Sequence, residues 1–131
     1  MKKFNVRSSE QTEILDITHM VQSVINESGI TDGVCHVFIP HTTAAVTINE
    51  NADPDVKTDM LKEINKIVPF SDSYRHMEGN SAAHIKASLF GNSEMIIIQN
   101  GLLQLGTWQG IFFCEFDGPR TRKVWITLIS S

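Results

Sequence analysis

Cysteine is scarce in this chain, which argues against a disulfide-stapled protein. The sequence has two cysteines, Cys35 and Cys114, and they do not form a CxxC pair. Small secreted scaffolds depend on several disulfides at regular spacing. Because each of these cysteines lies within an apolar run, we expect two buried free thiols in a reducing compartment.

An excess of positive charge is also missing. The 11 Lys and Arg residues are outnumbered by 15 Asp and Glu, which gives a formal net charge of −4. Proteins that bind nucleic acid by neutralising many phosphates carry a basic field. We therefore expect no nucleic-acid partner.

Long hydrophobic runs are absent. No segment approaches the roughly 20 apolar residues of a membrane span. The basic start, residues 1–7, is followed by polar residues rather than by the apolar core of a secretory signal. We expect a cytoplasmic protein without a membrane partner.

The familiar local signatures of catalysis are missing as well. The chain has no HExxH or HxH pair, no Walker-type loop and no GxSxG elbow. These absences argue against nucleotide triphosphate hydrolysis and covalent hydrolase chemistry. Any site must draw its residues from separate elements.

What is present is the composition of one globular domain. The 131 residues are 41% hydrophobic and 20% charged, which is ordinary for a chain that buries one core. The sequence contains no internal repeat or linker. We predict a single domain over residues 1–131.

Hydrophobic periodicity predicts three helices among short strands. The helices are expected at 19–28 after a Thr18 cap, from Pro54 to just before Pro69 with Asp53 as cap, and from Asn80 or Ser81 to Leu89. Strands are expected around 4–6, 13–17, 33–39, 44–48, 94–99, 102–105, 111–116 and 122–129. The pair Asn100-Gly101 favours a tight hairpin, and the last strands are predicted to form a meander.

Three histidines lie where predicted elements begin or end. These are His41, His76 and His84, and His76 falls in a long loop over 70–80. Imidazoles from separate elements can converge on a metal, although each can equally well terminate a strand or helix. His19 and His36 are better explained as structural residues.

Other polar side chains offer the components of an anion site. Thr42, Thr43 and Thr107 supply hydroxyls, and Arg75 supplies a fork of donors for phosphate or carboxylate. Trp108 could stack on a flat heterocycle or fill a subunit interface. Glu50 could act as a general base, although a lone glutamate is more often a surface residue.

Several motifs, taken in order, resemble the YjbQ-type family over nearly the whole chain. The matching segments are His41-Thr42-Thr43-Ala44-Ala45, Thr47-Ile48-Asn49-Glu50-Asn51, Ala52-Asp53-Pro54-Asp55-Val56, Tyr74-Arg75-His76, Glu78-Gly79, Ala83-His84-Ile85-Lys86-Ala87-Ser88, Gly91 and Leu105-Gly106-Thr107-Trp108-Gln109. The residue after His76 is Met77, so no aspartate at that position can bind a metal.

The resemblance implies a fold and an assembly. It implies an α+β fold, a two-layer sandwich of a mostly antiparallel β-sheet with about three helices packed on it, commonly assembled as a homotrimer. It also implies a secondary thiamine-phosphate synthase activity, which joins a pyrimidine diphosphate to a thiazole phosphate and releases pyrophosphate. The recurrent histidines match His41, His76 and His84, and the other signature positions match Asn49, Glu50, Thr107, Trp108 and Gln109.

Our leading hypothesis is a transferase with a three-histidine site for a divalent metal of the zinc or magnesium class. In this hypothesis Glu50 and His84 are catalytic, while Trp108 and Gln109 shape a cleft between subunits. Arg75 would help to neutralise the departing pyrophosphate. The alternative is a non-catalytic trimer that binds a small phosphorylated metabolite, and a third interpretation gives Trp108 and the histidines a role in oligomer contacts alone.

Overall fold

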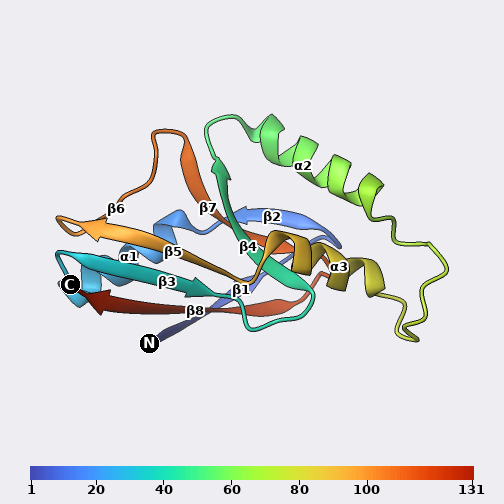
Figure 1. Cartoon of the computed structure of the whole chain (residues 1–131), viewed down its shortest axis with the longest axis horizontal. Coiled ribbons are helices and arrows are strands. Elements are labelled where there is room, and N and C mark those ends of the chain that lie inside the picture. The colour runs from blue at the N-terminus through green and yellow to red at the C-terminus, as the bar shows by residue number, and fades with distance from the viewer.

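A computed structural model describes residues 1–131 as two antiparallel sheets and three helices (Figure 1). The helices are α1 (Thr18–Ser28), α2 (Pro54–Ile67) and α3 (Ser81–Phe90). The strands are β1 (Lys2–Arg7), β2 (Glu13–Asp16), β3 (Gly33–Phe38), β4 (Ala44–Glu50), β5 (Ser93–Gln99), β6 (Leu102–Leu103), β7 (Gln109–Glu115) and β8 (Thr121–Ser130). The expected α+β fold with three helices is confirmed.

The strands divide between a large sheet and a small sheet. The large sheet has the order β1-β8-β3-β5-β6, and the small sheet has the order β2-β7-β4. The predicted meander of the last strands is wrong, because β7 leaves the large sheet and pairs with β2 and β4. The following strand, β8, then returns between β1 and β3.

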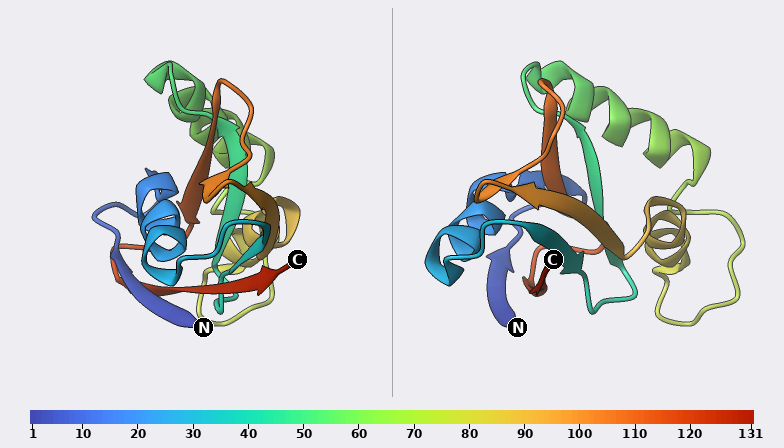
Figure 2. Two further views of the ribbon diagram at one scale, coloured as in Figure 1. Left: turned by 90° about the vertical axis from the view of Figure 1, so that its left-hand side faces the viewer. Right: turned by 60° about the vertical axis from the view of Figure 1, so that its left-hand side comes forward.

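The small sheet is covered on both faces, which places it at the centre of the molecule. One face packs against α1 and the inner face of the large sheet, with Val46 and Phe113 fully buried there. The other face, with Ala45 and Phe112, packs under α3 and α2. Figure 2 shows α1 on one side of the two sheets and the other two helices on the opposite side. Burial on both faces explains why β7 is a nearly continuous apolar run rather than an alternating one.

Local signals explain where the elements begin and turn. The side chain of Asp53 accepts a hydrogen bond from the Asp55 amide ahead of Pro54, which starts α2 as predicted. Asn100 and Gly101 both have positive φ, as a two-residue hairpin between β5 and β6 requires. The predicted Thr18 cap is wrong.

The start of α1 is organised by Asp16 instead. Ile17 occupies the capping position without a side-chain hydrogen bond, and the Asp16 carboxylate accepts from both the amide and the hydroxyl of Thr18. A carboxylate close to the helix N-terminus is stabilising there. The Thr18 hydroxyl in turn accepts from the Ile111 amide, which ties α1 to β7.

Both cysteines are free and buried, as expected. Burial raises the pKa of the Cys35 thiol to about 11, so this thiol is protonated at neutral pH. None of the helices is both long and apolar enough to cross a membrane.

The side chain of Lys86 joins the two outer helices. It is fully buried on α3, its Nζ donates to Asn65 on α2 over 2.7 Å, and it lies 3.5 Å from the centroid of the Phe70 ring. Burial lowers the pKa of Lys86 to about 8. One residue therefore anchors α2 and the beginning of the loop that carries His76.

Candidate functional site

The three predicted histidines line one cavity at the end of the molecule where α3 begins. The cavity has a volume of about 590 Å³, and it includes His41 from the segment before β4, His76 from the loop after α2, and His84 from α3. The other lining residues are Phe38, Ile39, Pro40, Thr42, Thr43, Glu78, Asn80, Asn92, Asp117, Arg120 and Arg122. Of the other predicted site residues, Thr42 and Thr43 belong to this cavity.

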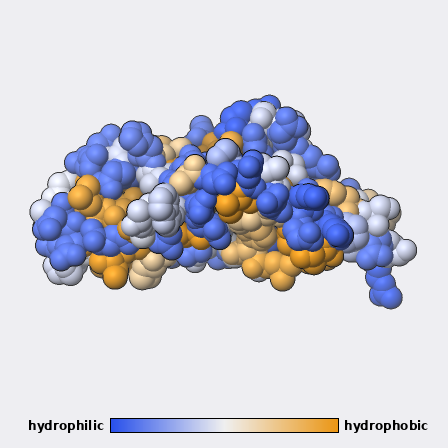
Figure 3. Space-filling view, turned by 90° about the horizontal axis from the view of Figure 1, so that it is seen from above, coloured by the Kyte–Doolittle hydropathy of each residue, from blue (hydrophilic) through white to orange (hydrophobic).

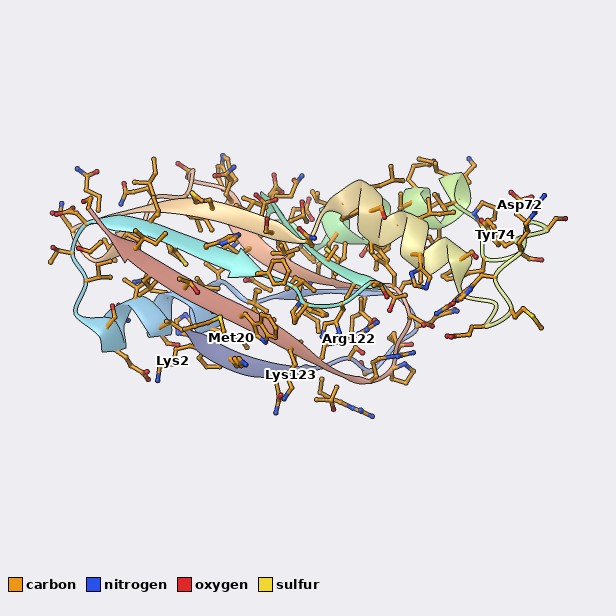
Figure 4. The ribbon with its side chains drawn as sticks, turned by 60° about the horizontal axis from the view of Figure 1, so that its bottom comes forward. Lys2, Met20, Asp72, Tyr74, Arg122 and Lys123 are labelled. Atoms are coloured by element: carbon orange, nitrogen blue, oxygen red, sulfur yellow. The ribbon has the colours of Figure 1, made fainter.

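A buried ion pair forms the back of the cavity. Arg122 is 3% exposed and Glu115 is 0% exposed, and the Arg122 Nε lies 2.9 Å from one carboxylate oxygen and 3.0 Å from the other. The Arg122 Nη2 also donates to Glu115 and to the hydroxyl of Thr43. Figure 4 labels Arg122 next to Lys123 on β8.

Hydrogen bonds keep the Glu115 carboxylate ionised. Burial alone would raise its pKa, but donation from Arg122, Ser8 and the Asp117 amide holds the pKa of Glu115 below its usual value. The Ser8 hydroxyl lies 2.6 Å from Glu115 and accepts from the Arg120 amide at 2.9 Å. Every polar atom of the Glu115 and Arg122 side chains, except one nitrogen of Arg122, therefore has a hydrogen-bond partner.

The remaining end of the Arg122 side chain faces the cavity. Its Nη1 forms no hydrogen bond within the chain, although Nε and Nη2 are both occupied. Because Arg122 lines the cavity, Nη1 presents two donors to whatever enters it. The guanidinium is held rigid by Glu115 and Thr43, so these donors are preorganised.

His41 is fixed as a neutral ring. Its Nε2 accepts a hydrogen bond from the Lys123 amide at 2.8 Å, which places the ring proton on Nδ1. Burial first, and then the charge of Arg122, lower the pKa of His41. The chain therefore presents His41 as a hydrogen-bond donor.

The other two imidazoles have no hydrogen-bond partner in the chain. The ring centroids of His76 and His84 lie 5.3 Å apart at 90° to each other. No group of three or more His, Cys, Asp or Glu side chains is arranged to hold a metal ion, and the Nε2 of His41 is already occupied. The arrangement described does not fit the predicted three-histidine metal site, which stays a prediction from the sequence.

Two residues at the N-terminus of α3, Asn80 and His84, line the same cavity. Asn80 occupies the capping position, but its side chain donates to Asp117 over 2.9 Å instead of capping the helix. The positive end of the helix dipole is therefore left uncapped beside His84, in the first turn. This environment favours a negatively charged ligand.

The remaining predicted site residues lie elsewhere in the chain. Arg75 lines an adjoining hollow together with His76 and His84. Asn49, Glu50, Thr107, Trp108 and Gln109 lie at the far end of β4 and the start of β7, where Glu50 pairs with Gln109. Because a strand rises about 3.3 Å per residue, Glu50 lies about 20 Å from Ala44 at the cavity end.

The turn that carries Trp108 is held by its own contacts. The Gly106 amide donates to the Gln109 side chain at 2.8 Å, and the Asn51 amide donates to the Trp108 carbonyl at 2.9 Å. A Cβ at Gly110 would lie 2.6 Å from the side-chain Nδ2 of Asn51 and 2.9 Å from its Cβ, so any larger residue there would clash with Asn51. Trp108 itself is 63% exposed.

Of the 14 cavity residues, the sequence predicted five as site residues and missed the other nine, among them Arg120, Arg122 and Asn92. Arg122 lies two residues before the buried Val124 on β8, so both side chains are on the face of the sheet that also carries the buried Val6 of β1. This alternation along the strand was visible in the sequence. An arginine at an inward position of a strand requires a buried partner.

These features define a class of protein: a chain of two packed antiparallel sheets with a histidine and arginine cavity beside the start of a helix. A family model described as UPF0047 protein YjbQ-like matches residues 2–131. The chain belongs to this family.

Relatives in bacteria and archaea support the same assignment. YugU of Bacillus subtilis is 51% identical over 130 residues, which are 98% of each chain. MJ1081 of Methanocaldococcus jannaschii is 49% identical over 127 residues, 97% of this chain and 92% of that one. A crystal structure of a YjbQ/UPF0047 family protein from Clostridium acetobutylicum is 54% identical, covers 98% of this chain and 100% of that chain, and superposes with a TM-score of 0.97.

Neutralising Glu115 tests whether the ion pair supports the cavity. We expect Glu115→Gln to lower the free energy of unfolding at pH 7 by about 3–5 kcal/mol, because Arg122 loses its buried counter-charge. The lowered pKa of Glu115 adds stability above the unfolded pKa of about 4.3, and this contribution disappears as the pH falls below it. The difference from wild type, measured by urea denaturation, should therefore shrink in acid.

A surface pair provides the control. Glu27 pairs with Lys2 where both side chains are largely exposed, so Glu27→Gln should change stability by at most about 1 kcal/mol. Equal small effects of both substitutions would contradict the role given to Glu115.

Proposed function

We propose that the histidine cavity binds a small phosphorylated metabolite. The observation that carries this proposal is the buried Arg122 guanidinium, whose Nη1 is its one end without a hydrogen bond and faces the cavity. With Nε and Nη2 of Arg122 occupied, its Nη1 can still offer charge-assisted hydrogen bonds to phosphate oxygens. Arg120 lines the same cavity and its Nη1 also has no partner in the chain.

Neutral donors near the arginines support the same proposal. His41 carries a proton on Nδ1, and the first turn of α3 contributes the positive end of its dipole. A bound phosphate would exchange its hydrating water for protein donors that are already in position, so Arg122 would not have to move. Each arginine is already paired with a carboxylate, Arg122 with Glu115 and Arg120 with Asp117, so the proposal rests on their free Nη1 donors and not on net charge.

Binding of pyrophosphate tests this proposal directly. By calorimetry at fixed ionic strength, we expect wild type to bind pyrophosphate saturably, and His84→Ala and Arg120→Ala to bind it at least about tenfold more weakly, a loss of about 1.4 kcal/mol or more. His19→Ala is the matched control, because His19 is exposed on α1 and lies outside the cavity.

Removal of metal separates the anion proposal from the predicted metal site. We expect the affinity for pyrophosphate to be unchanged after treatment with EDTA, because the proposed donors belong to the protein. Binding that depends on a metal, together with metal content lost on replacing any of His41, His76 or His84, would overturn direct anion binding in favour of the metal site.

Transfer with release of pyrophosphate is a second candidate, and it is favoured by the neutral state of His41. Charge that develops on a leaving pyrophosphate would be met by Arg122 Nη1 and by the Nδ1 proton of His41. His84 has no partner in the chain and is free to move a proton. Glu50 lies about 20 Å along β4, so it would act at this cavity only if a second copy supplied it.

Rescue of a thiamine auxotroph tests the transferase proposal. If the thiamine-phosphate synthase reaction is performed, wild type should rescue growth at native expression, and His84→Ala should lower the rate of thiamine phosphate formation at least about 100-fold. Retained rescue by Glu50→Gln would exclude Glu50 as the base. Absence of rescue by wild type would reject the enzyme and leave the binding protein.

We further propose that the open face of the large sheet forms the interface of a homo-oligomer, with a trimer as the expected state. This face carries Val34, His36, Phe38, Met95, Ile97, Trp125, Thr127 and Ile129. Met95 is 62% exposed and Ile97 is 63% exposed. In Figure 3 hydrophobic residues gather along the lower edge, the side that faces the viewer in Figure 1. Exposed apolar residues gathered on one face in this way mark an interaction surface.

Light scattering after gel filtration tests the interface. We expect wild type to have three times the chain mass of 14.7 kDa, and Ile97→Lys to have the mass of one chain, because a charge on this face must be desolvated on association. Leu89→Lys is the control, since Leu89 is also 63% exposed but lies on α3. A wild-type mass of one chain would contradict the proposal.

A further inference from the structure

A second hollow adjoins the histidine cavity. It has a volume of about 510 Å³ and shares His41, Thr42, His84 and Asn92 with the first cavity. Its remaining walls are Ala44, Ala87, Ser88 and Gly91. The two hollows therefore adjoin one another at these four residues.

Charge is segregated between the two hollows. Glu78, Asp117, Arg120 and Arg122 line the first cavity, and none of them lines the second. The second hollow has no Asp, Glu, Lys or Arg among its lining residues. An uncharged group can enter it without a counter-charge, whereas an isolated ion would lose hydration there without compensation.

The shared walls offer hydrogen bonds that the chain does not use. The hydroxyl of Thr42, the side-chain amide of Asn92 and the ring of His84 have no hydrogen-bond partner in the chain. The Ser88 hydroxyl donates to the His84 carbonyl at 3.0 Å and can still accept. Together these groups both donate and accept, which suits a hydroxyl-bearing ligand better than an apolar one.

Small residues make room for that ligand. Ala44 is 1% exposed and Ala87 is 7% exposed, and their short side chains take up little of the space beside the hollow that they line. A Cβ at Gly91 would meet nothing within 4 Å. The hollow therefore exists because four neighbouring wall residues have short side chains.

We propose that the second hollow is a subsite for the organic half of a phosphate monoester, an uncharged group with several hydroxyls and the size of a sugar. Its phosphate lies in the first cavity with Arg122 and Arg120. The inference rests on the proposed function and names the class of metabolite: a sugar phosphate or a similar polyol phosphate.

Calorimetry with four probes and three variants tests the subsite. For wild type we expect ribose 5-phosphate to bind at least about tenfold more tightly than inorganic phosphate. Glycerol 3-phosphate should be intermediate, and phenyl phosphate should gain little over inorganic phosphate. Ser88→Phe, which fills the second hollow from its rim, should lower the affinity for ribose 5-phosphate to that for inorganic phosphate.

Two control variants separate filling of the second hollow from other effects of the Ser88→Phe substitution. Ser88→Ala removes the hydroxyl without filling the hollow and should keep most of the preference for ribose 5-phosphate. Leu89→Phe places the same ring at the neighbouring exposed position, outside both hollows, and should leave all affinities unchanged. Unchanged binding of inorganic phosphate to Ser88→Phe shows that the variant is folded and that the first cavity is intact.

The outcomes distinguish the subsite from the proposed function. Equal binding of ribose 5-phosphate by Ser88→Phe and wild type, or tighter binding of phenyl phosphate than of ribose 5-phosphate, overturns the subsite while phosphate binding stands. Failure of wild type to bind inorganic phosphate, pyrophosphate or any ester overturns the proposed function, and the subsite falls with it.

Discussion

The ion pair between Arg122 and Glu115 is the interaction on which the candidate site depends. It joins the end of β7 to the start of β8 and reaches Thr43 just before β4, so it connects both sheets. Removing two ions from water costs several kcal/mol each, and the cost is recovered only when every donor and acceptor has a partner. The Ser8 hydroxyl and the Asp117 amide donate the remaining hydrogen bonds to the Glu115 carboxylate, and only the Nη1 of Arg122 is left for a ligand.

The strand that carries Arg122 also fixes His41. Lys123 lies on β8 beyond the residues that pair with β3, and its amide donates to the Nε2 of His41. A backbone donor cannot change its protonation state, so it specifies the tautomer of His41 whatever enters the cavity. His76 and His84, which lack such partners, are the two imidazoles that remain free to respond to a ligand.

Local patterns in the sequence predicted the elements well, and the pairing of strands poorly. Asp53, Pro54 and the pair Asn100-Gly101 act within a few residues, and each terminates or starts an element as expected. Which strands become neighbours depends on contacts between distant segments. The apolar run of β7 was compatible with either sheet, and only the packing of α3 and α2 on its second face decides that it lies in the small sheet.

The site was predictable in one part and not in another. The three histidines line one cavity, because the segment before β4, the loop after α2 and the first turn of α3 lie at the same end of the molecule. Glu50 and Trp108 were expected near the histidines. However, His41 precedes β4 and Glu50 is its last residue, and the two ends of this strand lie about 20 Å apart. Arg122 was overlooked because arginine is normally a surface residue. Its position two residues before the buried Val124 on β8 nevertheless puts it on the buried face of the strand.

The rigidity of β4 has a consequence for assembly. Its cavity end is fixed by Thr43 and Arg122, and just beyond its other end the Asn51 amide donates to the Trp108 carbonyl, so the two ends cannot approach one another. The exposed indole of Trp108 thus lies on an ordered turn. Burying it in an interface would therefore cost little backbone conformational entropy. Such a preorganised aromatic side chain is a typical anchor of an interface. Together with the open sheet face, it is the surface through which the proposed homo-oligomer would place Glu50 and Trp108 beside the histidine cavity of a second copy.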